Sequence, residues 1–190
     1  MKFRGTSIKW VQMPSYPAGP ALCLWGAIFF CCLSGHSGCR WEDASQGPIL
    51  SNSSSSVTGL AREVLQGLYL GDFESLAAKA VNRDEFRRHV WPELPISRPE
   101  CGMSWEYVWN DSHRKSLMYL SNTLARQRGR KYDLVKVRFL GGVTEYEGYT
   151  LHRDARLVVR DESEKERELN VFGSVFEMGG EFKVMTYIVD

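Results

Sequence analysis

The last sixty residues of this 190-residue chain constrain its fold most strongly. Short runs of alternating apolar and polar residues are separated there by glycine pairs and by one highly charged segment. Such alternation is typical of strands with one buried face and one solvated face. It predicts antiparallel strands at 132–140, 143–160, 167–178 and 181–189. Gly141-Gly142 and Gly179-Gly180 are predicted turns, and 161–166 is a predicted hairpin tip.

The second of these strands is unusually long, and we expect it to be kinked at Gly148 or within 152–154. Upstream of the strands, the apolar residues recur at helical spacing. Thr58 is the predicted cap of a first helix, which ends at Gly71, and Asp72 is the predicted cap of a second.

Asn82 and Glu85 have the spacing of a capping box, which opens a third, short helix that Pro92 stops. The aromatic run 103–109 alternates with other residues and is predicted to be extended, and a longer helix is predicted over 112–128. Helices followed by consecutive strands indicate an α+β fold, with N-terminal helices packed on a bent antiparallel sheet of four or more strands.

The N-terminus is typical of an export signal. Basic residues without any acid precede the uncharged run 21–33, which is shorter than the ~20 residues that span a bilayer. The serine-rich stretch that follows is small, polar and unable to bury apolar surface. The chain therefore divides into a signal peptide at 1–38, a flexible linker at 39–56 and a folded domain at 57–190.

Ser37 and Gly38, directly before Cys39, resemble the lipobox of bacterial lipoproteins, although His36 stands where an aliphatic residue is usual. The resemblance implies lipidation of Cys39 and a place at the bacterial cell envelope, anchored to the membrane. The alternatives are cleavage nearby and release as a soluble exported protein, or retention of the uncleaved apolar stretch as an anchor.

Composition excludes several classes of function. The formal net charge of +1, from 24 basic and 23 acidic residues, provides no field for nucleic acid. Cys101 is the one cysteine of the predicted domain, so no disulfide within the domain is expected. The sequence contains no glycine-rich phosphate loop and no metal-ligand cluster, and neither a cofactor nor a metal is predicted.

The order of elements resembles the nuclear transport factor 2-like superfamily. The resemblance rests on the segments 60–68, 73–80, 112–128 and 132–189, and on no short motif. It implies a cone-shaped, bent sheet around the helices, with a functional place at the open end of the cone. Members include ketosteroid isomerases, dehydratases, polyketide cyclases and domains that only bind, so the fold leaves the chemistry open.

Several residues are candidates for such a place. The ligand-pocket candidates are aromatic or imidazole side chains: Tyr69, Trp105, Trp109, His113, Tyr146, Tyr149 and His152. His113 is either a pocket acid or base, or a semi-buried structural residue. His152 and Asp154 are two apart on one strand, so they are either an acid/base pair on one face or a solvated strand edge.

Three hypotheses of function follow. The first is a non-enzymatic domain that binds a small apolar ligand or a protein partner. The second is a small isomerase or dehydratase-like enzyme that uses His113 or the pair His152–Asp154 inside the cone. The third is a structural partner that forms a homodimer through the open face of its sheet.

Overall fold

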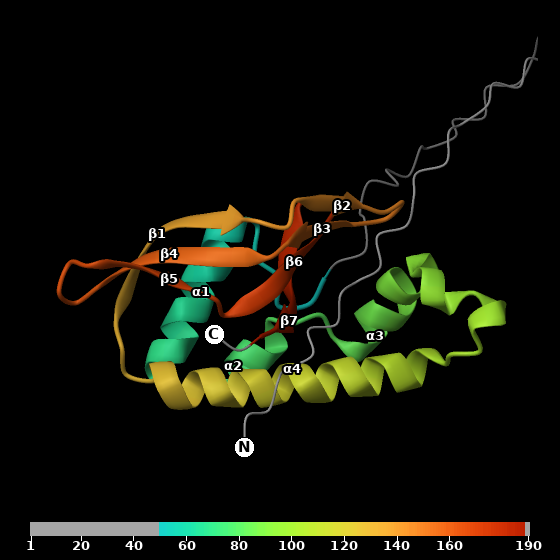
Figure 1. Ribbon diagram of the computed structural model, residues 1–190, viewed down its shortest axis with the longest axis horizontal. Helices are drawn as coiled ribbons and strands as arrows, with labels where there is room; N and C mark the ends of the chain where they lie inside the picture. The colour runs from blue at the N-terminus through green and yellow to red at the C-terminus, as the bar shows by residue number, and fades with distance from the viewer. Residues whose placement is uncertain (1–49, 189–190) are drawn as a thin grey trace, which may run out of the picture. The chain divides into compact units, whose positions relative to one another are not determined.

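A computed structural model describes residues 50–188, so the predicted signal, Cys39 and most of the predicted linker lie outside the described part. Its α-helices are α1 Val57–Leu70, α2 Phe73–Ala78, α3 Arg83–Glu85 and α4 Trp105–Gln127. A single π-helical turn, Phe86–Val90, follows α3 directly, and three short 3-10 turns then lead to α4. The strands are β1 Tyr132–Phe139, β2 Val143–Glu145, β3 Thr150–Arg153, β4 Ala155–Asp161, β5 Glu166–Leu169, β6 Phe172–Met178 and β7 Glu181–Tyr187 (Figure 1).

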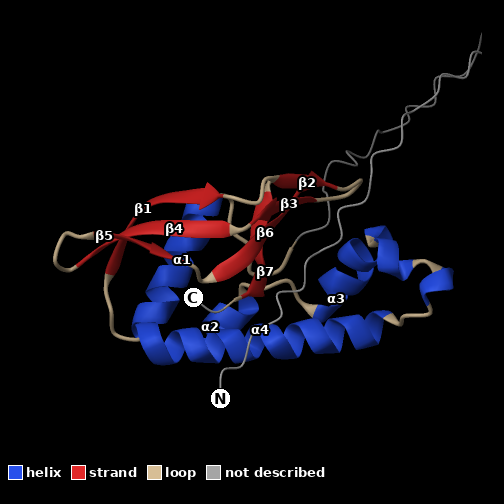
Figure 2. Cartoon of the chain, viewed as in Figure 1, coloured by secondary structure: helices blue, strands red, loops and turns tan. Residues whose placement is uncertain are grey.

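The seven strands form two antiparallel sheets, in the orders β1-β4-β5 and β2-β3-β6-β7. Chain segments pass from one sheet to the other, because β1 leads into β2, β3 into β4 and β5 into β6. Helices pack against these strands, and α4 contributes to the core beside both sheets (Figure 2). The predicted α+β class with consecutive antiparallel strands is therefore confirmed.

The predicted turn at Gly141-Gly142 is wrong. This segment carries β1 into β2 and stays hydrogen-bonded to the segment that joins β3 to β4. The Gly141 N–H donates to the Arg153 carbonyl at 3.1 Å. Both positions favour glycine, for different reasons. A Cβ on Gly141 would lie 2.9 Å from the Cβ of Arg153, and Gly142 has a φ of +74°, in the left-handed region. The chain reverses instead at Glu147 and Gly148, between β2 and β3.

The helix caps follow the sequence signals closely. Gly71 ends α1 in the left-handed conformation, Asp72 accepts from Ser75 N–H at 3.0 Å, and Asn82 and Glu85 form the predicted capping box. The cap of α1 is Ser56 rather than Thr58, because Ser56 Oγ accepts from the Gly59 N–H.

The long helix begins earlier than predicted, and the extended segment at 103–109 is wrong. Ser104 caps α4 by accepting from the Tyr107 N–H at 3.3 Å. Trp105 and Trp109 are four residues apart, and both side chains pack in the protein interior. Tyr107, between them, is 64% exposed. The aromatic spacing therefore has a helical period, which the alternation of aromatic residues concealed.

The serine run 51–56 is part of the folded domain, which corrects the flexible linker predicted there. Leu50 is buried, and the Ser51 N–H donates to a carboxylate oxygen of Glu85 at 2.9 Å. Ser54 pairs with Phe182 through two backbone hydrogen bonds and covers the outer edge of β7. The run is held by its backbone and hydroxyl groups, which do not need apolar side chains.

Beside the apolar core, the structure buries one ion pair between α3 and β7. Lys183 is fully buried, and its Nζ lies 2.7 Å from Glu85 Oε2. Burial opposes the ionisation of Glu85. The hydrogen bond from Lys183 and those from the backbone N–H groups of Asn82 and Ser51 outweigh it and hold the pKa of Glu85 below its ordinary value.

Removing one member of this pair is expected to destabilise the domain. Lys183→Met leaves the Glu85 carboxylate buried without its cation, and we expect the free energy of unfolding to fall by about 3–5 kcal/mol. Equilibrium unfolding in denaturant measures this loss. Lys165→Met, at an exposed hairpin tip, is the matched control and should change stability by less than about 0.5 kcal/mol. Equal stability of the two variants would show that the buried pair is unimportant.

Candidate functional site

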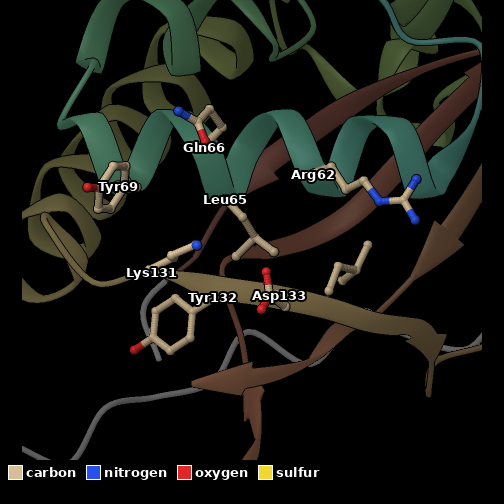
Figure 3. A pocket seen from close by; sticks show the side chains of 8 residues that line it. Arg62, Leu65, Gln66, Tyr69, Lys131, Tyr132 and Asp133 are labelled. Atoms are coloured by element: carbon tan, nitrogen blue, oxygen red, sulfur yellow. The ribbon is translucent and has the colours of Figure 1, made fainter. Parts of the chain in front are cut away.

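A hollow of about 510 Å³ lies between α1 and the start of β1. Four of its residues come from one face of α1 and four are consecutive in the chain: Arg62, Leu65, Gln66, Tyr69, Lys131, Tyr132, Asp133 and Leu134. Leu65 projects from the helix towards the strand, and Asp133 of β1 and Lys131 just before it project towards the helix (Figure 3). The volume is within the range of sites that hold small ligands.

The two walls of this hollow are tied together at one end. The Gly129 N–H donates to the Tyr69 carbonyl at 3.0 Å, which joins the end of α1 to the loop after α4. The Tyr132 hydroxyl donates to Gln127 Oε1 at 2.9 Å and fixes the start of β1 on α4. These bonds hold the end of α1, the loop after α4 and the start of β1 together at this end of the hollow.

The charge of the hollow is unbalanced. Arg62 and Lys131 supply two cations, and Asp133 supplies one carboxylate. Neither cation forms an ion pair with another residue of the described part, so both are available to a ligand. Together with Tyr69 and Leu65, they make a surface that suits an anion attached to an apolar or aromatic body.

The sequence candidates divide between this hollow and a second place. Tyr69 lines the hollow. Trp105, Trp109 and Tyr146 lie instead in an aromatic cluster beneath the π-helical turn, among Phe86, Tyr149 and Phe176. Trp109 lies 5.4 Å from Phe86 and Tyr149 lies 4.4 Å from Tyr146, measured between ring centroids. The structure therefore brings most of the aromatic candidates together in a largely packed cluster, at whose edge Tyr146 and Tyr149 also line a smaller hollow of about 210 Å³.

His113 belongs to the edge of that aromatic cluster. Its ring stacks on Trp109 with 4.7 Å between ring centroids. Burial lowers the pKa of His113, which favours its neutral form. On the other side of the cluster, Arg83 and Arg87 each hold a guanidinium about 5 Å from the Trp105 ring. The π-helical turn thus contributes to packing through both its apolar and its cationic side chains.

Of the two alternatives for His152 and Asp154, the structure excludes the acid/base pair, because each residue has another partner. Asp154 has a φ of +53° where β3 passes into β4, so the two-residue alternation is broken between them, and it forms an ion pair with Arg156. His152 Nε2 lies 2.5 Å from Glu177 Oε2 on the neighbouring strand β6. This pair can exchange a proton, but the His152 ring lies against Phe139, and neither member lines the hollow at α1.

Sequence reasoning missed Arg62, Lys131 and Asp133. Their signal was weak, because charged residues on a helix face or at the start of a strand are usually solvated. The run 126–131 contains four cations, however, and indicated a local excess of positive charge that the balanced overall charge conceals.

Comparison with known proteins adds no relative to this description. A scan against protein-family models, a search of curated proteins and a search of solved structures all found no match. Between residues 50 and 188, no helix combines the length and the apolar character needed to cross a bilayer.

The aromatic cluster is expected to act as core rather than as a pocket. Trp109→Ala removes a large buried side chain, and we expect it to lower the free energy of unfolding by about 3–5 kcal/mol. Tyr107→Ala, on the exposed side of the same helix, is the control and should cost less than about 0.5 kcal/mol. Thermal or denaturant unfolding gives both values. A Trp109→Ala protein of unchanged stability would indicate that this region is not tightly packed.

Proposed function

We propose that this protein is an exported ligand-binding domain of the nuclear transport factor 2-like type, held at the bacterial envelope by a lipid on Cys39. The bent meander with helices packed against it supports the family. The order of basic residues, apolar run and Cys39 in the sequence supports the export and the anchor.

The observation that carries the binding proposal is the hollow between α1 and β1. It combines an apolar floor at Leu65, an aromatic wall at Tyr69 and the cations Arg62 and Lys131, which outnumber the one carboxylate of the hollow. We infer a small ligand that has a carboxylate, phosphate or sulfonate group attached to an apolar body. Its anion would lie between the two cations, and its body would cover the apolar wall.

Binding accounts for this site better than catalysis does. The His152–Glu177 pair can exchange protons but does not line the hollow, and His113 stacks against the packed aromatic cluster. An acid/base enzyme needs its proton-transferring group within hydrogen-bond reach of the ligand. In the hollow, the charged side chains are two cations and the single carboxylate of Asp133, a set suited to holding an anion.

The anionic probe anilinonaphthalene sulfonate tests the hollow directly. Its fluorescence increases on binding, and we expect Arg62→Glu/Lys131→Glu to weaken the affinity at least tenfold, because each charge-assisted contact contributes about 1.5–3 kcal/mol. The control is Arg88→Glu/Arg98→Glu, which reverses two exposed cations outside the hollow. Equal affinity of the two variants would place the probe elsewhere and reject this binding site.

The anchor is tested separately by metabolic labelling with a radioactive fatty acid. Wild-type protein should carry the label and sediment with the membranes, whereas Cys39→Ala should lose the label, since only the cysteine thiol accepts the lipid. Immunoblotting of the fractions controls for expression. Label that persists in Cys39→Ala, or its absence from wild type, would reject the lipid anchor and leave the binding site untouched.

A further inference from the structure

Exposed apolar and cationic side chains meet at the ends of α1 and α4. Tyr69 and Leu70 are 43% and 57% exposed at the last turn of α1. Arg128, Arg130 and Lys131, all exposed, follow α4. We call these five residues the basic corner. The sequence separates its two halves by more than fifty positions, and the fold places them together.

Two contacts show that the halves adjoin. The Gly129 N–H donates to the Tyr69 carbonyl at 3.0 Å. The Arg128 side chain lies over Gly71, where an added Cβ would come within 2.6 Å of Arg128 Nε. The cations and the two apolar side chains therefore form one continuous surface rather than two unrelated features.

The charge of this surface is strongly positive although the whole chain is nearly neutral. Arg128, Arg130 and Lys131 form no ion pair with another residue within 50–188. The acids closest in sequence are Asp72, whose carboxylate caps α2, and Asp133 in the hollow. Three cations beside an exposed leucine and tyrosine are suited to an interface between water and an anionic, apolar phase.

We propose that the basic corner docks the domain on a bilayer that contains anionic phospholipid, with the phosphate of a lipid headgroup at the hollow between α1 and β1. Tyr69 and Lys131 belong both to the corner and to the hollow, so a headgroup bound by the corner lies beside Arg62. The headgroup part of this inference rests on the proposed anion-binding function. The docking part rests on the corner itself.

Charge complementarity favours this occupant over the other two classes. A second copy of the chain would bring three further cations against the same corner. A nucleic acid is bound by many phosphate contacts along an extended basic surface, whereas here the cations cluster around an apolar pair. A bilayer supplies both requirements in one plane, because anionic headgroups attract each nearby cation and the interface accepts leucine and tyrosine side chains.

Co-sedimentation of the full chain with vesicles tests the docking. One set of vesicles is phosphatidylcholine alone, and the other also contains phosphatidylglycerol. We compare Leu70→Ser/Arg130→Gln, which alters the corner but not the lining of the hollow, with Met103→Ser/Arg98→Gln. The control residues are similarly exposed and lie before α4, whose 23 residues span about 35 Å.

Wild type is expected to prefer the phosphatidylglycerol vesicles, and added salt should reduce this preference. The corner variant should partition at least tenfold less well, since one cation alone accounts for about fivefold, and the control should match wild type. All variants contain the same N-terminal segment, so its contribution to vesicle binding cancels when the partition coefficients of two variants are divided. No preference in wild type, or a corner variant that partitions as well as the control variant, would overturn the docking.

Anilinonaphthalene sulfonate binding separates this inference from the proposed function. Vesicle docking that depends on the corner, in a protein whose probe binding does not depend on Arg62 and Lys131, supports the corner and rejects the anion-binding hollow and its headgroup. Probe binding that depends on the two cations, without preference for anionic vesicles, supports the hollow and rejects the membrane surface as the source of its ligand.

Discussion

The ion pair between the largely buried Glu85 and the fully buried Lys183 holds three separate parts of the domain together. The Glu85 carboxylate also accepts from Asn82 and from Ser51, so one side chain joins the serine run, the capping box of α3 and strand β7. A buried carboxylate without these donors would carry a large desolvation cost. The covered edge of β7 and the position of the π-helical turn both depend on this junction.

That junction also affects where a ligand can bind. The π-helical turn that follows α3 brings Phe86 and Val90 onto the aromatic cluster with Trp109. The space between this end of α4 and the sheet is thereby filled with side chains. The hollow is consequently found at the opposite end of the helix, where α1 and β1 separate and charged residues replace apolar ones.

Local chemistry was predictable from the sequence, and the pairing of distant segments was not. The caps at Asp72 and Asn82 and the turn at Gly179-Gly180 follow from groups that bond within a few residues. Gly141-Gly142 has the same local signature as a turn. Its backbone stays hydrogen-bonded to the segment between β3 and β4, however, and it carries the chain from one sheet to the other. The hydrogen-bonding partner of His152 is Glu177 on another strand, which spacing along one strand cannot reveal.

By itself, the sequence determined the α+β class, the position of the helices before the strands and the presence of alternating strands, because these depend on periodicity and on short-range capping. Only the tertiary structure decided that most of the predicted aromatic residues form core, that the serine run belongs to the domain, and that Arg62 and Lys131 line one hollow. These outcomes depend on contacts between residues far apart in the chain, and residue spacing carries no information about such contacts. The basic corner depends on both sequence and tertiary structure. Its cations are visible in the sequence as one run, whereas the fold brings their apolar neighbours to them from α1.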